Sequence, residues 1–524
     1  MKKIKVKAKF LLNKEYYLLY FLLIVVFISR HLLIKDGLVP FQFDHGKDSL
    51  AVLDMWLNKN PKLVGPWTSI PGLYFGPGWY YLILPSFLLG AWHPLSPVYL
   101  MIFLLMLQVM LAYRYLGKEE AILMATAPLW IMISTSAWNP FPMTFISLVI
   151  LIIIKEFKKS KEVQSIKLFI MALVAALAFH FSTAFAIFYP ILILFSLYQH
   201  RIKLDCKKIL TMLVGYLIPF IPQMIFELRH NFIELRAVLA YLQSGQTQSF
   251  NFAKMQTVLK TIYDDFKFSV IPSTHFPNLE IFDHLFLIFF ILLAVSAFFT
   301  KRANRIKTTG FKLTLTAEYL FWPVLALIGY SFLHFNIWYV LALTPLFVMF
   351  AGDVLRAQSK IVRSTYLVLM FISLFLKVDY FLSTNQYQLS QASSFLSPKI
   401  NAINLIRSDA NGQAFNSYHY APDIYDFPYQ YLYFWQALNG QPLPVEFTYQ
   451  KGETNYIVQK KELLNYFSEQ QMSGDAAISY FIVEPASVKQ FQDNWWGNFG
   501  IKDPASLEKL PSTSALEIYK YKLN

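Results

Sequence analysis

The sequence predicts a polytopic α-helical membrane protein with about eleven transmembrane helices and a C-terminal domain outside the membrane. Of its 524 residues, 56% are hydrophobic and only 15% are charged, whereas a soluble protein of this length carries more charge. Apolar runs of about twenty residues, the length that spans a bilayer core, recur along most of the chain. After residue 384 such runs become rare, which marks a separate domain.

The apolar runs place the expected spanning helices. They are 16–35, 95–113, 121–137, 142–157, 166–182, 184–199, 209–227, 283–300, 315–333, 337–355 and 364–383. The run 79–90, WYYLILPSFLLG, holds only twelve residues, about 18 Å of helix against a core of about 30 Å. We expect it to be re-entrant or interfacial; if it crosses, one later boundary shifts.

Short basic clusters set the orientation. They are RYLGKEE, KEFKKSKE, HRIKLDCKK, KRANRIKTTGFK and RAQSKIVRS. With the N-terminus inside, these eleven helices put all five clusters in the cytoplasm, as the positive-inside rule requires. The net charge of +14 is thus a property of inner loops beside the lipid bilayer and gives no support to a nucleic-acid partner. A multi-pass protein of the cytoplasmic (inner) membrane is expected, and its single cysteine, Cys206, excludes an intramolecular disulfide.

The same topology divides the chain into a transmembrane module, 1–383, and a C-terminal domain, 384–524. The module carries a first outer loop, 36–94, and a second outer loop, 228–282. Strand-like stretches such as YFIVEPAS and a helical stretch, KKELLNYFSEQ, predict an extracytoplasmic α/β or α+β domain. Polar and aromatic clusters gather at the outer helix ends, which favours chemistry at the outer membrane surface.

The first outer loop opens with FDHGKDS, residues 43–49. An ionised Asp44 or Asp48 is suited to act as a general base toward an attacking hydroxyl. The pair is also suited to hold a divalent cation, so a metal is left open. A structural alternative is that Asp44 caps a helix beginning near Gly46 and Asp48 favours the positive end of its dipole.

FDHGKDS followed by GPWTSIPGLYFGPGWYYLILPSFLLG resembles the first-loop pattern of bacterial GT-C glycosyltransferases. These are polytopic relatives of protein O-mannosyltransferases and of the aminoarabinose transferase that modifies lipid A. The later segments AFHFSTAFAIFYP, IPFIPQMIFELRHNF and HFNIWYVLALTP resemble segments of the same group, so the likeness covers roughly residues 15–355. It implies the GT-C fold for the module. The C-terminal domain resembles no family that we recognise.

The resemblance also implies a reaction. A polyprenyl-phosphate donor presents its sugar at the outer surface, an acceptor hydroxyl attacks the anomeric carbon, and the lipid phosphate leaves, usually with inversion. The role of base falls on Asp44, with Asp48 in support. His45 stands where the protein O-mannosyltransferase pattern has glutamate, which favours the bacterial subgroup. The acceptor is left open among glycan, lipid and protein.

Further candidate residues lie at outer helix ends. A guanidinium at such an end is suited to bind the leaving phosphate, with Glu227 orienting Arg229, although interfacial snorkelling explains this arginine as well. For the donor phosphate we expect Arg229, His230, His180 and Lys47. For the substrate we expect Tyr80, Tyr81, Trp138, Asn139, His334 and Tyr339. An aromatic belt and packed histidines are the structural alternatives.

Two other functions fit the same membrane placement. A lipid-linked polysaccharide ligase or polymerase also works on the outer surface, with a pyrophosphate-linked donor. A transporter or flippase would need a polar path through the membrane, and few ionisable residues fall at mid-helix positions. The sequence contains no CxxC, HExxH or P-loop motif.

Overall fold

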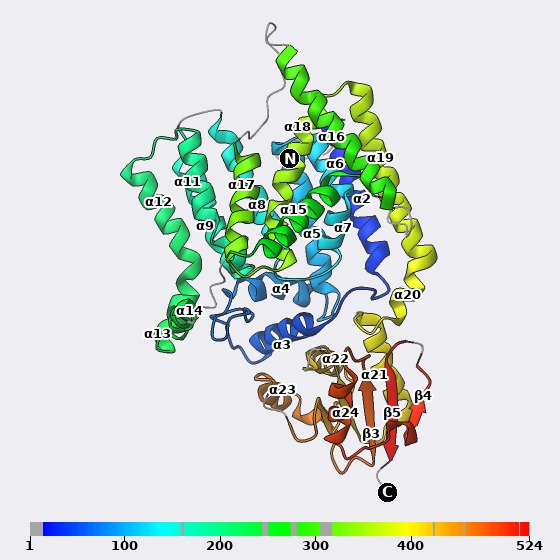
Figure 1. Ribbon diagram of the computed structural model, residues 1–524. Helices are drawn as coiled ribbons and strands as arrows, with labels where there is room; N and C mark the ends of the chain where they lie inside the picture. The colour runs from blue at the N-terminus through cyan, green and yellow to red at the C-terminus, as the bar shows by residue number, and fades with distance from the viewer. Residues whose placement is uncertain are drawn as a thin grey trace, which may run out of the picture. The chain divides into compact units, whose positions relative to one another are not determined.

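The computed structural model describes eight ranges of the chain, with gaps between them: 14–158, 162–243, 250–273, 280–303, 317–422, 425–453, 456–512 and 514–522. Contacts divide the chain into two units (Figure 1). The first, which we name the helical unit, comprises Met1–Leu32, Leu63–Trp79 and Met101–Tyr380. The second, the mixed unit, comprises Leu33–Lys62, Tyr80–Leu100 and Phe381–Asn524.

Parts of several expected loops lie outside the described residues. They are 1–13 at the N-terminus, 159–161 and 304–316 in two basic turns, and 244–249 and 274–279 in the second outer loop.

The helical unit is built almost entirely of helices. They are η1 (Lys14–Tyr16), α2 (Tyr17–Ile34), α5 (Ser96–Tyr115), α6 (Lys118–Thr126), α7 (Pro128–Ser134), α8 (Met143–Phe157), α9 (Ser165–Leu177), η2 (Ala178–His180), α10 (Thr183–Ala186), α11 (Tyr189–Gln199), α12 (Cys206–Leu217), η3 (Ile218–Phe220), α13 (Ile221–Arg229), α14 (Ile233–Gln243), α15 (Phe252–Val270), α16 (Glu280–Ala303), α17 (Glu318–Phe332), η4 (Ile337–Leu343), α18 (Thr344–Arg356) and α19 (Lys360–Tyr380). The ends of α2 and α5 fall in the mixed unit.

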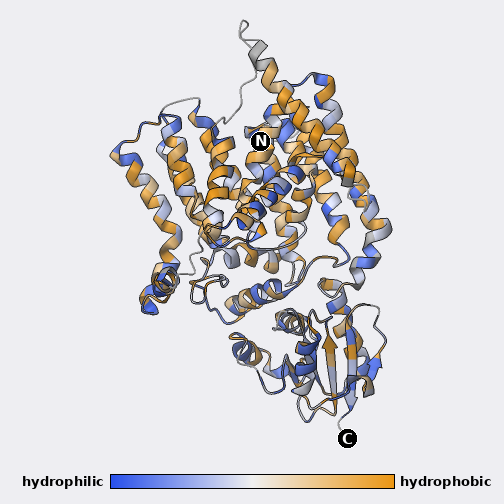
Figure 2. Ribbon diagram, in the orientation of Figure 1, coloured by the Kyte–Doolittle hydropathy of each residue, from blue (hydrophilic) through white to orange (hydrophobic). Residues whose placement is uncertain are grey.

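Six helical stretches in the described part of the chain are long and apolar enough to cross a membrane. They are Lys14–Ile34, Ser96–Tyr115, Cys206–Arg229, Ile281–Phe299, Ile337–Arg356 and Lys360–Thr384. Hydrophobic residues run along most helices of this unit (Figure 2), as in an integral membrane protein. Other expected spans are shorter or divided; 121–137, for example, is split at Pro128 between α6 and α7, because proline removes a backbone donor. The count of eleven therefore stays a prediction.

The short apolar run after the first loop forms α4 (Gly78–Leu89). Its twelve residues are about 18 Å of helix, too short for the bilayer core. It belongs with the shorter apolar helices and not with the six candidate spans. Its expected re-entrant or interfacial placement stays a prediction.

The mixed unit combines helices with one sheet in its described residues. Its further elements are α3 (Phe43–Leu57), η5 (Phe381–Asn385), α20 (Gln386–Gln391), α21 (Leu396–Ala410), β1 (Phe415–Tyr420), α22 (Phe427–Leu438), β2 (Glu446–Thr448), α23 (Lys460–Tyr466), η6 (Ser468–Gln470), β3 (Ile478–Val483), α24 (Lys489–Gly497), η7 (Pro504–Ser506), β4 (Glu508–Leu510) and β5 (Glu517–Lys522). The strand order is β2-β1-β3-β5-β4. β1 is parallel to β2 and β3, whereas β5 is antiparallel to β3 and β4.

Helices cover both faces of the central strands. Side chains alternate between the faces of a strand. Tyr418 and Tyr420 pack in one cluster with Trp495 of α24. On the opposite face, the hydroxyl of Tyr433 in α22 donates to Ser417 Oγ at 2.7 Å. The expected mixture of helices and strands in the C-terminal region is therefore present, and its place outside the membrane stays a prediction.

The first-loop helix α3 packs against α22 within the mixed unit (Figure 1). Gly46 makes the contact: a Cβ atom there would lie 2.4 Å from the backbone carbon of Phe427 and 2.4 Å from the backbone nitrogen of Pro428. Backbone atoms at the start of α22 have little freedom to move aside. The glycine is thus required for the approach that holds α3, with Asp44 in its first turn.

We expect Gly46→Ala to destabilise the protein by about 1–3 kcal/mol, the usual cost of forcing an extra methyl into a packed contact. Thermal unfolding of the detergent-purified protein measures the effect. The matched control is Gly497→Ala at the end of α24, where a Cβ meets nothing within 4 Å. Equal melting temperatures for the two variants would show that the contact at Gly46 is unimportant.

Candidate functional site

The acidic opening of the first loop lies inside α3. The helix begins at Phe43, and Gln42 is its N-cap residue. The backbone N–H of Gln42 donates to Nδ1 of His45 at 3.3 Å. Asp44 therefore sits in the first turn, and the alternative that it caps a helix starting near Gly46 is wrong, because the helix begins earlier.

The two aspartates differ in exposure. The side chain of Asp44 is 39% exposed, and the Lys47 ammonium, itself 9% exposed, donates to Asp44 Oδ1 at 2.7 Å. Asp48 is only 4% exposed. Asp44 is thus the more accessible of the two carboxylates and is oriented by Lys47, whereas Asp48 is enclosed by the packing.

The two expected tyrosines of α4 have different surroundings. Burial, with the charges of Asp48 and then Asp44, raises the pKa of Tyr80 well above its usual value, so Tyr80 keeps its proton and lies in the field of both carboxylates. Tyr81 is exposed, and its hydroxyl donates to the carbonyl oxygen of Lys62 at 3.1 Å. Tyr80 thus belongs with the acidic pair, and Tyr81 does not.

The donor set around Asp44 does not fit a metal ion. Across the described ranges, no group of three or more His, Cys, Asp or Glu side chains is placed to hold one. Next to Asp44 the positive partner is the ammonium of Lys47. We therefore derive no chemistry from a metal.

The Gly-Pro-aromatic segment of the first loop folds as a tight hairpin in the helical unit. Trp67 pairs with Tyr74 in an antiparallel bridge, and the backbone N–H of Thr68 donates to the carbonyl of Leu73 at 3.0 Å. Gly72 lies at the turn with φ +81°, a conformation that favours glycine. The glycines and prolines that predict irregular structure thus specify this turn.

His180 ties the start of α4, just after the hairpin, to η3. Its Nδ1 accepts from the backbone N–H of Gly78 at 2.8 Å, and its Nε2 donates to the carbonyl of Pro219 at 3.0 Å. It is 3% exposed, and a Cβ on Gly76 would lie 2.4 Å from its ring. Both ring nitrogens are engaged, so His180 serves as a positioning residue and a phosphate would have to displace one of these bonds.

Arg229 and His230 end α13 on an exposed surface. His230 donates through Nδ1 to the carbonyl of Phe226 at 2.9 Å and stacks on its ring, whereas the Arg229 side chain is accessible to a ligand. Glu227 does not orient Arg229 as expected. Its carboxylate accepts from the backbone N–H groups of Glu234 and Leu235 at 2.9 and 3.0 Å, and so caps α14.

Glu234 is a buried carboxylate that the sequence analysis missed. It accepts from the backbone N–H of Tyr74 at 3.0 Å and so joins the hairpin to α14. Burial, with a smaller effect from Glu227, raises the pKa of Glu234 to about 7. In the sequence, Glu234 stands out only by following Glu227 by seven residues, which gives no indication that it is buried.

The aromatic candidates form a second cluster in the helical unit. The rings of Trp138 and Trp338 lie 4.8 Å apart, and Tyr339 contacts both Trp338 and His334. Asn139 is 6% exposed, and its side chain donates to the carbonyl of Phe181 at 2.7 Å. Asn139 is thus structural, while Trp138, His334 and Tyr339 share one aromatic patch.

The candidate residues therefore fall into two groups. The mixed unit holds Asp44, Lys47, Asp48, Tyr80 and Tyr81. The helical unit holds Trp138, Asn139, His180, Arg229, His230, His334 and Tyr339.

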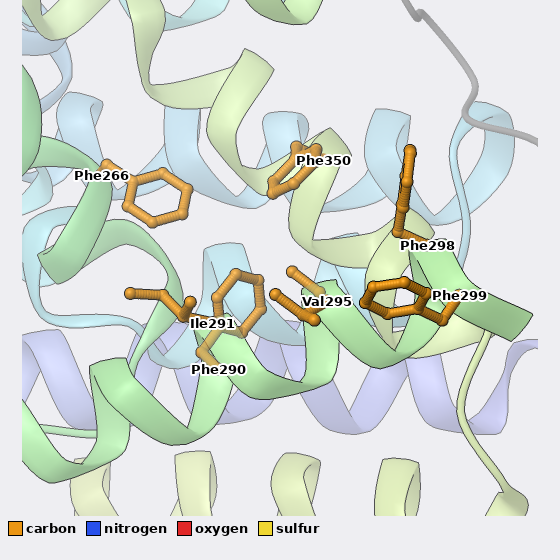
Figure 3. A pocket seen from close by; sticks show the side chains of 8 residues that line it. Phe266, Phe290, Ile291, Val295, Phe298, Phe299 and Phe350 are labelled. Carbon is orange, nitrogen blue, oxygen red and sulfur yellow. The ribbon is translucent and has the colours of Figure 1, made fainter.

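A separate pocket of about 430 Å³ lies between α15, α16 and α18. In Figure 3, Phe266 and Phe350 lie across it from Ile291 and Val295. Its lining consists of phenylalanine, isoleucine, valine and alanine side chains. These groups offer no acid, base or hydrogen bond, so this pocket carries no chemistry.

The environment of His45 predicts a pH dependence. Burial lowers the pKa of His45 to about 4, against the opposing charge of Asp44. Between about pH 6.5 and 4 the unfolded chain binds a proton that the folded protein does not, so stability falls as the pH falls, by at most about 1.4 kcal/mol per unit. We expect His45→Gln to make the melting temperature depend less on pH over this window. The exposed control, His334→Gln, should leave that dependence unchanged. Parallel curves for wild type and His45→Gln would contradict the assignment.

Comparison with solved structures identifies the fold. Over 96% of this chain and 97% of the other, the structure superposes on ArnT from Cupriavidus metallidurans bound to undecaprenyl phosphate, with a TM-score of 0.57 and 8% identity. The apo state of the same protein gives a TM-score of 0.56 and 9% identity over the same shares. No protein-family model and no curated protein sequence matches the chain. ArnT is a GT-C aminoarabinose transferase, and this chain has the GT-C fold that the first-loop pattern predicted.

Proposed function

We propose that the protein is a membrane glycosyltransferase that moves a sugar from a polyprenyl-phosphate donor to an acceptor hydroxyl, with Asp44 as the general base. One observation carries the proposal: an accessible carboxylate, oriented by Lys47, opens the first loop of a chain with the ArnT fold. We place the reaction at the outer face of the cytoplasmic membrane, with the N-terminus inside and the C-terminal domain outside.

The proposed step is a single displacement. The acceptor oxygen forms a bond to the anomeric carbon while the bond from that carbon to the phosphate oxygen breaks. The electron pair of the broken bond leaves with the polyprenyl phosphate, and the hydroxyl proton passes to the Asp44 carboxylate. Attack opposite the leaving group inverts the anomeric configuration. Every atom and electron pair is accounted for, so the step needs no redox partner.

Supporting roles follow from the surroundings of each residue. Lys47 holds the Asp44 carboxylate through its 2.7 Å bond and is proposed to offset the charge of the donor phosphate. The protonated Tyr80 and the buried Asp48 shape the field around Asp44. Arg229, with its exposed guanidinium, is proposed to bind the donor phosphate. The aromatic patch around Trp138 is proposed to contact the substrate.

The neighbouring structure favours one donor class. ArnT has been solved with undecaprenyl phosphate, a monophosphate carrier. This supports a monophosphate donor over the pyrophosphate-linked donor of a polysaccharide ligase or polymerase. We therefore propose a lipid-monophosphate-dependent transferase.

Asp44→Asn should lower turnover by about 10²- to 10⁴-fold, the usual contribution of a general base. The amide keeps an oxygen that accepts from Lys47, so the fold should survive. Turnover is measured as free polyprenyl phosphate released from a panel of polyprenyl-phosphate sugars, a product that is independent of the sugar.

The control is Asp36→Asn, which removes another exposed carboxylate of the first loop (its side chain is 46% exposed) and should leave turnover unchanged. Full activity of a folded Asp44→Asn protein would exclude Asp44 as the base.

Arg229→Ala should weaken binding of the polyprenyl-phosphate donor by about tenfold or more, because a charged hydrogen bond to phosphate is lost. The control is Arg236→Ala, another exposed arginine of the second outer loop. Donor affinity is measured by titration in nanodiscs. Unaltered affinity in Arg229→Ala would remove Arg229 from the phosphate site.

A further inference from the structure

A groove of about 600 Å³ opens on the mixed unit beside the C-terminal end of α3. Three aromatic side chains line it and remain accessible: Trp56 at 49%, Tyr81 at 43% and Tyr466 at 54% exposed. They come from α3, α4 and α23, so elements far apart in sequence build one surface. The groove takes no part in the bond-making step proposed above.

One wall of the groove is held in place by Asp54, which is 1% exposed. Its carboxylate accepts from the side chains of Asn58 at 2.9 Å and Asn60 at 3.3 Å, and it is also bonded to the Lys62 ammonium. The hydroxyl of Tyr81 donates to the carbonyl of Lys62. The loop after α3 and the Tyr81 ring are thereby fixed before any ligand arrives, which lowers the entropy cost of binding.

Lys59 lies within this fixed loop and lines the groove. Its backbone has φ 51°, the left-handed region that residues other than glycine rarely adopt. Such strain is retained where the surrounding structure enforces it, often at ligand sites. Among the described residues, Lys59 is the only charged side chain of the lining, so the groove favours an anion.

The lining distinguishes between kinds of ligand. The pocket between α15, α16 and α18 has only apolar side chains and is suited to hydrocarbon alone. The groove instead adds flat aromatic faces, phenol groups and an ammonium to the apolar side chains of Met55, Leu57, Pro61 and Leu84. Aromatic faces pack on the C–H surfaces of sugar rings, while their polar tips stay in water. This combination suits a saccharide that carries acidic groups.

We propose that the groove binds an acidic saccharide, as a remote part of the acceptor. This inference rests on the proposed function, because it assigns the acceptor class of that reaction. Trp56 follows Asp44 by twelve residues of helix, about 18 Å along its axis. An acceptor bound at both places is therefore a chain of several sugar residues, and a monosaccharide acceptor gains nothing from the groove.

Binding is tested on the full chain in zwitterionic nanodiscs by calorimetric titration with a hexasaccharide of galacturonic acid. We expect wild type to bind it, and Trp56→Ala and Tyr466→Ala to bind it about tenfold more weakly. Wild type should bind the acidic hexasaccharide more tightly than neutral maltohexaose, and Lys59→Gln should lose this preference. Phe491→Ala, a control that removes an exposed aromatic of α24 outside the groove, should bind within about twofold of wild type.

Two results would overturn the inference. One is that wild type binds neither saccharide. The other is that the groove variants bind the hexasaccharide as tightly as wild type does. This holds even if the same variants lose binding to anionic lipid vesicles. A melting temperature close to wild type excludes loss of fold as the cause, and Tyr466→Leu, which removes the aromatic face but keeps an apolar side chain, repeats the test where Tyr466→Ala fails to fold.

Turnover separates this inference from the proposed function. Release of polyprenyl phosphate to water, without acceptor, should be the same in wild type and Trp56→Ala, while transfer to the hexasaccharide should show a raised KM with kcat unchanged. Saccharide binding without turnover of any donor would overturn the proposed function and support the groove as a saccharide site. If Trp56→Ala has normal donor turnover and an unchanged KM for the hexasaccharide, the saccharide site in the groove is overturned and the proposed function stands.

Discussion

The close contact between the backbones of α3 and α22 at Gly46 is the constraint on which the proposed site depends. Without a side chain there, the first turn of α3 lies directly against the start of α22. This contact holds α3, which follows the opening of the first loop, in the same unit as the C-terminal sheet. The base proposed for the reaction is therefore held by a helix from the C-terminal part of the chain.

This arrangement explains why charged groups gather in so apolar a chain. At one end of α3, Lys47 orients an accessible Asp44, one helical turn before a buried Asp48. At the other end, Asp54 accepts hydrogen bonds from the loop that carries Lys59 and so holds that loop in place. One helix thus positions a proposed catalytic group and a proposed binding groove, and both depend on how it packs. In the helical unit, His180 and Glu234 hold the hairpin of the same loop in a comparable way.

Much of this organisation could be predicted from sequence, because it depends on local pattern. The apolar runs predict α2 and α19, and the twelve-residue run 79–90 predicts a short helix where α4 lies. The resemblance of the first loop predicts the GT-C fold. The start of α3 could not be predicted well. Aspartate is the commoner cap, whereas this helix uses Gln42 with His45 as its partner. The partnership of α3 with α22 has no local signal, since it joins residues from the two ends of the chain.

The lipid that accompanies the protein during purification tests the central claim most directly. Mass spectrometry of lipids extracted from protein isolated in mild detergent should find a polyprenyl monophosphate, free or carrying a single sugar, enriched over the bulk membrane. Enrichment of a pyrophosphate-linked oligosaccharide, or of ordinary phospholipids alone, would contradict a transferase that takes its sugar from a lipid monophosphate.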